Sequence, residues 1–120
     1  MYKIMTADNM IQEFEWINRK DMFTWSGCKA IIDYYDKCYE DSIDIEFNPY
    51  DILSQWTEYG KTTFFTIEDM LDDYGYLIGF DVDITDIQER EAIIIQLINY
   101  INKNNYAVRL KNGNVLIMDF

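Results

Sequence analysis

The last fifteen residues carry the pattern that most constrains how this chain can fold. Two apolar segments, Tyr106–Leu110 and Val115–Phe120, flank the polar stretch Lys111–Asn114. The Asn112-Gly113 pair readily adopts the two positive φ angles of a type I′ turn. The sequence therefore predicts a C-terminal β-hairpin.

Two helices are expected in the first forty residues. Thr6 or Asp8 can cap the first, and its apolar positions recur at helical spacing, at Met10, Phe14 and Ile17. Ser26 is the expected cap of the second helix, which runs to about residue 40. Its inward stripe is Cys28, Ile31, Ile32, Tyr35 and Cys38, with acids on the outer face.

The middle of the chain alternates strand and helix signals. Residues 2–5 can form an edge strand, and Ile43–Phe47 alternates apolar and acidic residues, which predicts a half-buried strand. Asn48-Pro49 ends this strand, and a short helix is expected over 50–59. Residues 76–80 are expected to form a strand or an extended connector.

Two capping boxes mark later helices. Thr66 with Asp69 opens a helix that Gly75 ends, and Thr85 with Gln88 opens one that runs to about Lys103. The core stripe of the second is Ile87, Ile94, Leu97, Ile98 and Ile101.

These elements predict an α+β fold. We expect residues 1–120 to form a single acidic domain, with about four helices packed on a small, mainly antiparallel sheet that ends in the hairpin. The length fits one core, and an aromatic content of 17% argues against disorder.

The composition excludes several kinds of chemistry. The chain has no histidine, so it cannot build Ser-His or Cys-His catalytic groups or mixed Cys/His zinc sites. Cys28 and Cys38 lie ten residues apart in one expected helix, about 15 Å along its axis, too far for a disulfide. Free thiols, no signal peptide and no membrane span lead us to expect a cytoplasmic protein. We expect no cofactor.

The charge is strongly acidic and unevenly spread. The chain has 22 acids and 10 bases, a net charge of −12, which disfavours direct binding to nucleic acid or to an anionic membrane. Between Ala30 and Ile95 stand 17 acids and only three bases. The middle of the chain therefore carries more than the whole net charge.

The spacing of these acids suggests a binding surface. Acids three and four positions apart share a helix face at about 5–6 Å intervals, close to the roughly 6–7 Å between phosphates along a nucleic-acid strand. Such an array can occupy a cationic groove built for DNA or RNA. The candidate partner-binding residues are Asp33, Asp36, Glu40, Asp44, Glu46, Glu68, Asp69, Asp72, Asp73, Asp81 and Asp83. The alternative is a plain solvated surface that serves solubility.

Other motifs have simpler explanations. Asp81-Val-Asp83-Ile-Thr85 is similar to the D-x-D-x-T motif of haloacid-dehalogenase-type phosphatases, but too few residues follow it for that fold. The same stretch lacks the glycine and glutamate of an EF-hand, which leaves only weak divalent-ion binding among the clustered acids. We expect Cys28 and the three tryptophans to be core residues and the protein not to be an enzyme.

One resemblance adds a biological context. Phe23-Thr-Trp-Ser-Gly-Cys-Lys-Ala-Ile-Ile-Asp-Tyr-Tyr35, followed by Ile45-Glu-Phe-Asn-Pro49 and Gln55-Trp-Thr-Glu-Tyr59, resembles a family of small, very acidic proteins of bacteriophages and mobile elements. The C-terminal segments of these proteins are similar to Val115–Phe120. This chain departs from the family at Asn48, where an acid is usual. The resemblance brings no catalytic residues. It implies a location in the cytoplasm of a bacterial host cell and a role like that of anti-restriction and anti-CRISPR inhibitors.

The resulting hypothesis is a non-enzymatic inhibitor that occupies a basic groove of a host nucleic-acid-binding defence protein, a CRISPR effector or a restriction enzyme. We expect a monomer or a homodimer without metal. The alternative is an adaptor that binds another protein through apolar surface, by an exposed tryptophan or a sheet edge at 115–120.

Overall fold

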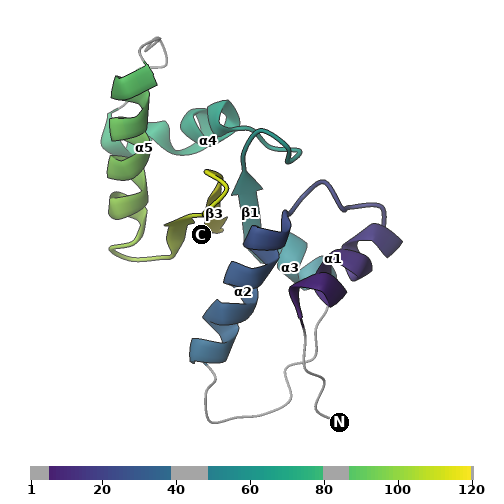
Figure 1. The fold of residues 1–120 in the computed structure, drawn as a ribbon. Coiled ribbons are helices and arrows are strands. Elements are labelled where there is room, and N and C mark those ends of the chain that lie inside the picture. The colour runs from purple at the N-terminus through teal and green to yellow at the C-terminus, as the bar shows by residue number, and fades with distance from the viewer. Residues whose placement is uncertain (1–5, 39–48, 80–86, 120) are drawn as a thin grey trace.

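Figure 1 shows the fold in a computed structural model, which describes residues 6–38, 49–79 and 87–119. The helices are α1 (Ala7–Trp16), α2 (Trp25–Cys38), α3 (Pro49–Gln55), α4 (Ile67–Tyr74), the 3₁₀ turn η1 (Gly75–Ile78) and α5 (Ile87–Ile101). The strands are β1 (Trp56–Tyr59), β2 (Ala107–Arg109) and β3 (Val115–Met118). The described chain is thus a small α+β domain with five α-helices and one antiparallel sheet.

Threonine side chains start three of the helices. Thr6 caps α1, and Thr66 forms the predicted capping box of α4 with Asp69. At α2 the predicted Ser26 cap is wrong because the helix already begins at Trp25. Thr24 takes the capping role there, since its hydroxyl accepts a hydrogen bond from the Gly27 N–H at 3.2 Å.

The sheet has the order β1-β3-β2, with β3 at the centre and both pairings antiparallel. The adaptor hypothesis placed an exposed sheet edge at 115–120. That is wrong for residues 115–118, because β3 has a strand on each side.

The connection from β2 to β3 differs from the expected type I′ turn. Asn112 does not have a positive φ, whereas Gly113 has a φ of 90°. The Gly113 N–H donates to the Leu110 carbonyl at 3.0 Å, and the Leu110 N–H donates to the Asn114 carbonyl at 2.8 Å. The strands are therefore shorter than predicted, and a longer loop with one left-handed glycine joins them.

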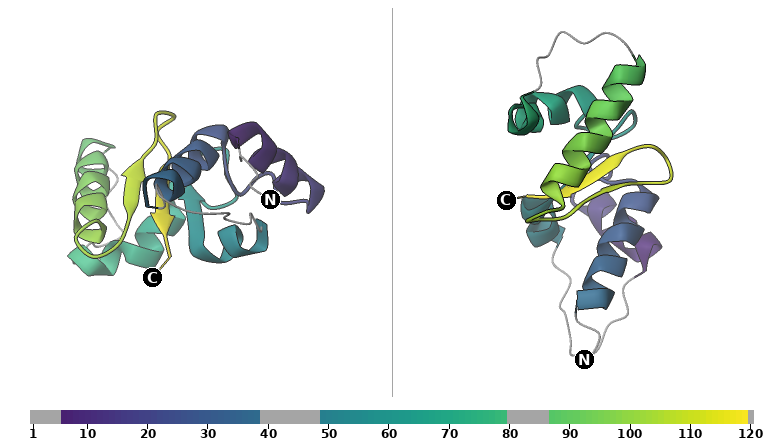
Figure 2. Two further views of the ribbon diagram at one scale, coloured as in Figure 1. Left: turned by 90° about the horizontal axis from the view of Figure 1, so that it is seen from below. Right: turned by 90° about the vertical axis from the view of Figure 1, so that its left-hand side faces the viewer.

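The helices cover the sheet on both faces, so the domain has three layers, which Figure 2 shows in two further views. Alternation along β3 decides which side chain enters which layer. Leu116 packs with Trp56 against α1, α2 and α3. Val115 and Ile117 pack with Tyr59 against α4 and α5, where the predicted stripe of Ile94, Leu97, Ile98 and Ile101 is buried.

Two further predictions are wrong. The helix expected over 50–59 ends at Gln55, and Trp56–Tyr59 form β1, because Trp56, Thr57 and Tyr59 are good strand residues that find a partner in β3. The strand or connector expected at 76–80 is the 3₁₀ turn η1 as far as Ile78.

Several expectations lie outside the described residues. They are the strands at 2–5 and 43–47, the Thr85 cap, and the side chains of Cys38 and Ile87. In the part of the chain that is described, no helix has the length and apolar character needed to span a membrane.

Candidate functional site

The predicted acids separate into two groups on opposite sides of the sheet. Asp33 and Asp36 are exposed on α2, in the layer packed against Trp56 and Leu116. The acids of α4 belong to the other layer. They are Glu68, Asp69, Asp72 and Asp73. The remaining candidates, Glu40, Asp44, Glu46, Asp81 and Asp83, lie outside the described residues.

Three of the six candidate acids that lie within the described residues are already engaged within the protein. Asp33 forms an ion pair with Lys29 at 2.8 Å, and Glu68 pairs with Arg90, which lowers the pKa of the Glu68 carboxyl group. The Asp69 carboxylate accepts a hydrogen bond from the Thr66 N–H at 2.8 Å. Asp36, Asp72 and Asp73 are exposed and form no ion pair with another described residue.

A fully buried carboxylate, Glu58 on β1, was not anticipated as a site residue. It accepts hydrogen bonds from the Thr24 N–H at 2.8 Å and the Thr24 hydroxyl at 2.7 Å, and from the Asn114 side-chain amide at 2.6 Å. Gly27 leaves room for it, since a Cβ at that position would lie 1.9 Å from a Glu58 oxygen. The available signal was strand parity, because Glu58 shares a face with the buried Trp56.

The same network reaches the loop between β2 and β3. The Asn112 side-chain amide donates to the Thr24 hydroxyl at 3.0 Å, and its carbonyl oxygen accepts from the Asn114 N–H at 2.9 Å. Gly60 lies so close to the Asn114 side chain that a Cβ there would overlap it, at 2.0 Å. Glu58 thus connects the start of α2, the end of β1 and this loop.

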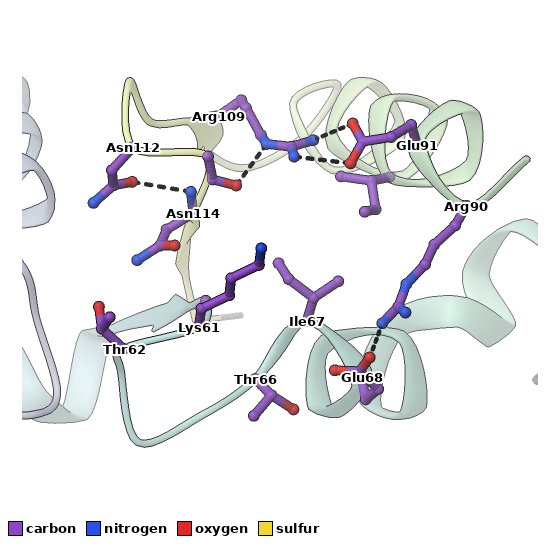
Figure 3. A pocket seen from close by; sticks show the side chains of 13 residues that line it. Lys61, Thr62, Thr66, Ile67, Glu68, Arg90, Glu91, Arg109, Asn112 and Asn114 are labelled. Carbon is purple, nitrogen blue, oxygen red and sulfur yellow. Dashed lines mark hydrogen bonds and ion pairs between the residues drawn. The ribbon is translucent and has the colours of Figure 1, made fainter. Parts of the chain in front are cut away.

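Next to this network is a pocket of about 770 Å³. Its walls come from the segment after β1, the start of α4, the first half of α5 and the β2–β3 loop (Figure 3). Three basic side chains line it, Lys61, Arg90 and Arg109. This is a third of the nine bases in the described ranges. The pocket also contains the acids Glu68 and Glu91, so its five charged groups sum to +1 in a chain of net charge −12.

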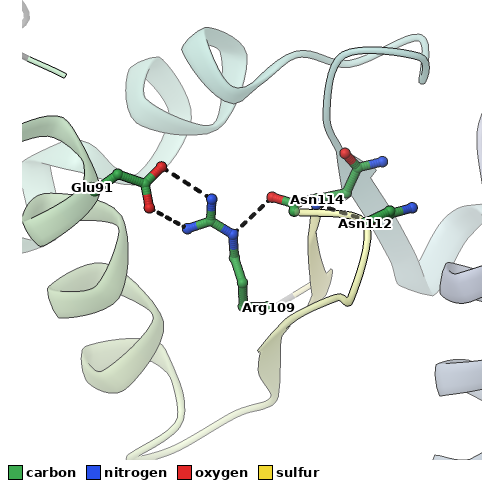
Figure 4. A network of polar contacts seen from close by, with 5 residues as sticks. Glu91, Arg109, Asn112 and Asn114 are labelled. Carbon is green, nitrogen blue, oxygen red and sulfur yellow. Dashed lines mark hydrogen bonds and ion pairs between the residues drawn. The ribbon is translucent and has the colours of Figure 1, made fainter. Parts of the chain in front are cut away.

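Arg109 is held in place at the pocket wall (Figure 4). Its two terminal nitrogens each donate to a Glu91 oxygen at 3.1 Å, and its Nε–H donates to the Gly113 carbonyl at 2.7 Å. This pairing lowers the pKa of the Glu91 carboxyl group. The guanidinium therefore has a defined orientation before any ligand arrives.

A separate polar cluster lies where β1, β3 and α4 meet. The Thr57 hydroxyl donates to the Asp119 carboxylate at 3.1 Å, and Tyr59 and Tyr74 interact through their hydroxyl groups. Burial raises the pKa values of Tyr59, Tyr74 and Asp119. These shifts favour the neutral forms, which fits a structural cluster.

The cysteine prediction is confirmed for Cys28. Its side chain is free and fully buried, and burial, with a smaller effect of Glu58, raises its pKa to about 12. This thiol is therefore not a reactive nucleophile near neutral pH. Among the described residues no cluster of three or more acids or cysteines has the geometry of a metal site.

Comparison with known proteins gave no match to a family model, to a curated protein or to a solved structure. The resemblance to acidic phage proteins therefore stays a prediction, and the functional argument rests on this chain's own residues.

Proposed function

We propose that this protein is a non-enzymatic inhibitor, encoded by a phage or mobile element, that occupies the basic nucleic-acid groove of a bacterial defence nuclease of the restriction or CRISPR type. The observation that carries the proposal is the set of exposed carboxylates that form no ion pair with another described residue, Asp36, Asp72 and Asp73. These groups are available to Lys and Arg side chains of a partner.

The paired acids rank lower in this proposal. Asp33 and Glu68 would have to exchange Lys29 and Arg90 for a partner's base, and Asp69 would have to leave its capping box. Because the acids of α2 and α4 lie on opposite sides of the sheet, we treat them as two contact sets rather than one continuous row.

The test measures DNA cleavage by a panel of restriction endonucleases and CRISPR effectors with increasing amounts of the purified protein. We expect inhibition of at least one nuclease, competitive with DNA and weaker as NaCl rises from about 0.1 to 0.5 M, because salt screens charge contacts.

The residues are tested with a matched pair of variants. Asp36→Asn, Asp72→Asn and Asp73→Asn together should weaken inhibition by roughly 10-fold or more, given about 0.5–1 kcal/mol for each lost charge pair. The control removes three charges elsewhere, in Glu15→Gln, Asp21→Asn and Asp51→Asn, which also lie on the surface. Equal loss in both triple variants, or inhibition that does not compete with DNA, would contradict the proposal.

The adaptor remains a second candidate because of one observation. The expectation that all three tryptophans are core residues is wrong: Trp56 is buried, but Trp16 is 79% and Trp25 is 50% exposed. An adaptor that uses such aromatic side chains would bind its partner equally well at both salt concentrations and would lose binding with Trp16→Ala.

A further inference from the structure

We infer that the pocket bounded by Lys61, Arg90 and Arg109 is a binding site for a phosphate-bearing small molecule. The inference is independent of the inhibitor proposal, because it uses basic residues inside a pocket rather than exposed acids.

The first argument is the placement of positive charge. The chain has only ten bases against 22 acids, yet three of them converge from distant positions in the sequence on one pocket. Arg90 and Arg109 are paired with Glu68 and Glu91 of the same pocket, so the surplus positive charge there is that of Lys61. A net positive pocket on an acidic protein attracts an anion of small size, whereas the surrounding acids reject a polyanion such as DNA.

The second argument is the availability of donors. Figure 3 shows the Lys61 amino group directed into the space between the β2–β3 loop and the start of α4, and no described acid forms an ion pair with it. Arg109 uses three N–H groups on Glu91 and Gly113, so two of its five remain for a ligand. An ammonium ion and an oriented guanidinium are the groups that proteins use for phosphate oxygens.

The third argument is that the site is built before binding. The Gly60 N–H donates to the Phe65 carbonyl at 3.0 Å, and Thr63 donates to the same oxygen at 2.8 Å, which holds the loop that carries Lys61. On the other side, Glu58 fixes Asn114. The buried network therefore positions both walls of the pocket.

The dimensions and the apolar lining residues of the pocket indicate the class of ligand. A volume of about 770 Å³ lies within the roughly 300–1,000 Å³ range of small-molecule sites and exceeds what one inorganic phosphate needs. Ile67 and Ile94 supply apolar surface beside the basic side chains. A phosphate group attached to a less polar body, as in a nucleotide, fits this combination.

The test is a pair of titrations of the full chain at low salt, one with pyrophosphate and one with ATP. Binding is measured by changes in the NMR chemical shifts of the backbone amides. We expect both probes to shift the amides of Gly60, Lys61 and Gly113. Tighter binding of ATP would show that its nucleoside adds contacts with the apolar lining residues Ile67 and Ile94. If neither probe produces shifts at concentrations up to about 10 mM, the weakest relevant affinity, the inference is overturned.

Two variants distinguish binding at this pocket from a general attraction of the anion to basic side chains. Lys61→Ala should weaken pyrophosphate binding by roughly 10-fold or more, as expected for a charge-assisted hydrogen bond. Lys20→Ala removes an equal charge from an exposed position that does not line the pocket and should leave binding unchanged. Equal weakening in both variants would overturn the inference. Because nuclease inhibition is measured separately, failure of this site leaves the inhibitor proposal untouched.

Discussion

The two faces of the central sheet are buried by different means. On the face toward α4 and α5, Val115 and Ile117 meet an aliphatic layer that includes Leu97 and Ile94. On the face toward α2, Leu116 and Trp56 share the interior with a carboxylate, Glu58, that is as completely buried as they are. Apolar packing is non-directional, whereas a buried carboxylate is tolerated only where donors meet it at the correct distance.

This difference shows which face specifies how the segments fit together. The aliphatic face can accept small shifts of α5 as long as volume is conserved. The polar face cannot, because Thr24 and Asn114 must lie within hydrogen-bond distance of the Glu58 oxygens and Gly27 must leave room for them. The register of β1 against β3 and the position of α2 are therefore set by hydrogen bonds on that face.

Removing the buried carboxylate should have the largest effect. Glu58→Ala leaves the Thr24 N–H and the Asn114 amide without an acceptor, and opens a cavity. We expect a loss of about 3–5 kcal/mol in the free energy of unfolding, measured with urea. Glu58→Gln keeps one acceptor oxygen and should lose less. Wild-type stability in Glu58→Ala would show that the network contributes little.

Gly27→Ala should disrupt the same hydrogen-bond network from α2, on the other side of the Glu58 carboxylate. In a solvent-exposed helix this change stabilises by about 1 kcal/mol, but here the added Cβ would displace the Glu58 carboxylate, so we expect a loss of roughly 1–3 kcal/mol. Ser26→Ala, at the neighbouring position, is the matched control.

A double-mutant cycle sharpens this prediction. In the Glu58→Ala background the Gly27→Ala change should become neutral or stabilising, because the added Cβ no longer overlaps the Glu58 carboxylate. Additive effects in urea unfolding would mean that the two residues do not act through their contact.

An intermediate effect is expected at the outer edge of β2. The Asn102 side chain accepts from the Ala107 N–H at 2.8 Å and donates to the Ala107 carbonyl at 2.6 Å, so it occupies the position of a neighbouring strand. Asn102→Ala should lose about 1 kcal/mol and expose an edge that favours self-association. Sedimentation velocity at rising concentration measures this, and Asn99→Ala is the control. A variant that stays as monodisperse as the control would refute the role of Asn102.

The smallest effect is expected at Asp119, in the polar cluster with Thr57 and Tyr74 beside the face that packs against α4 and α5. Although Asp119 reaches solvent, burial of its carboxyl group is the largest cause of its raised pKa, with Asp73 adding to it and hydrogen bonds from Thr57 and Tyr74 opposing it. The folded protein then holds this proton more tightly than the unfolded chain. The stabilisation is complete below the ordinary pKa and is lost as pH rises through the folded value.

Asp119→Asn should therefore raise the free energy of unfolding at pH 7, by less than about 1 kcal/mol, and change it little near pH 3. Thermal unfolding at the two pH values measures the difference, with Asp51→Asn as an exposed control. A larger gain at pH 3 than at pH 7 would reverse the inferred sign.

The local elements were predictable where one segment contains its own signal. Thr66 and Asp69 form the expected capping box, and the stripe from Ile94 to Ile101 is core as its spacing indicated. The errors occur where partners are distant in sequence. The sequence predicts Trp56–Tyr59 as the end of a helix, but these residues form a strand because they pair with β3. Trp16, at the end of α1, is exposed to solvent instead of buried in the core.

The candidate site followed the same division. The acidic helix faces could be identified from spacing, but their division between two layers depends on which face of the sheet each helix covers. The pocket with Lys61, Arg90 and Arg109 had no signal in the sequence, because its bases are 29 and 19 positions apart.

The sequence by itself determined the net charge, the absence of histidine chemistry, the α+β composition and the helix starts at Thr6 and Thr66, because each depends on composition or on neighbours within a few residues. Only the tertiary structure decided the strand order, the burial of Glu58, the engagement of three of the candidate acids and the gathering of bases around one pocket. The physical reason is that hydrogen bonds and ion pairs depend on distance in space. Thr24, Glu58 and Asn114 become neighbours only after the layers have packed.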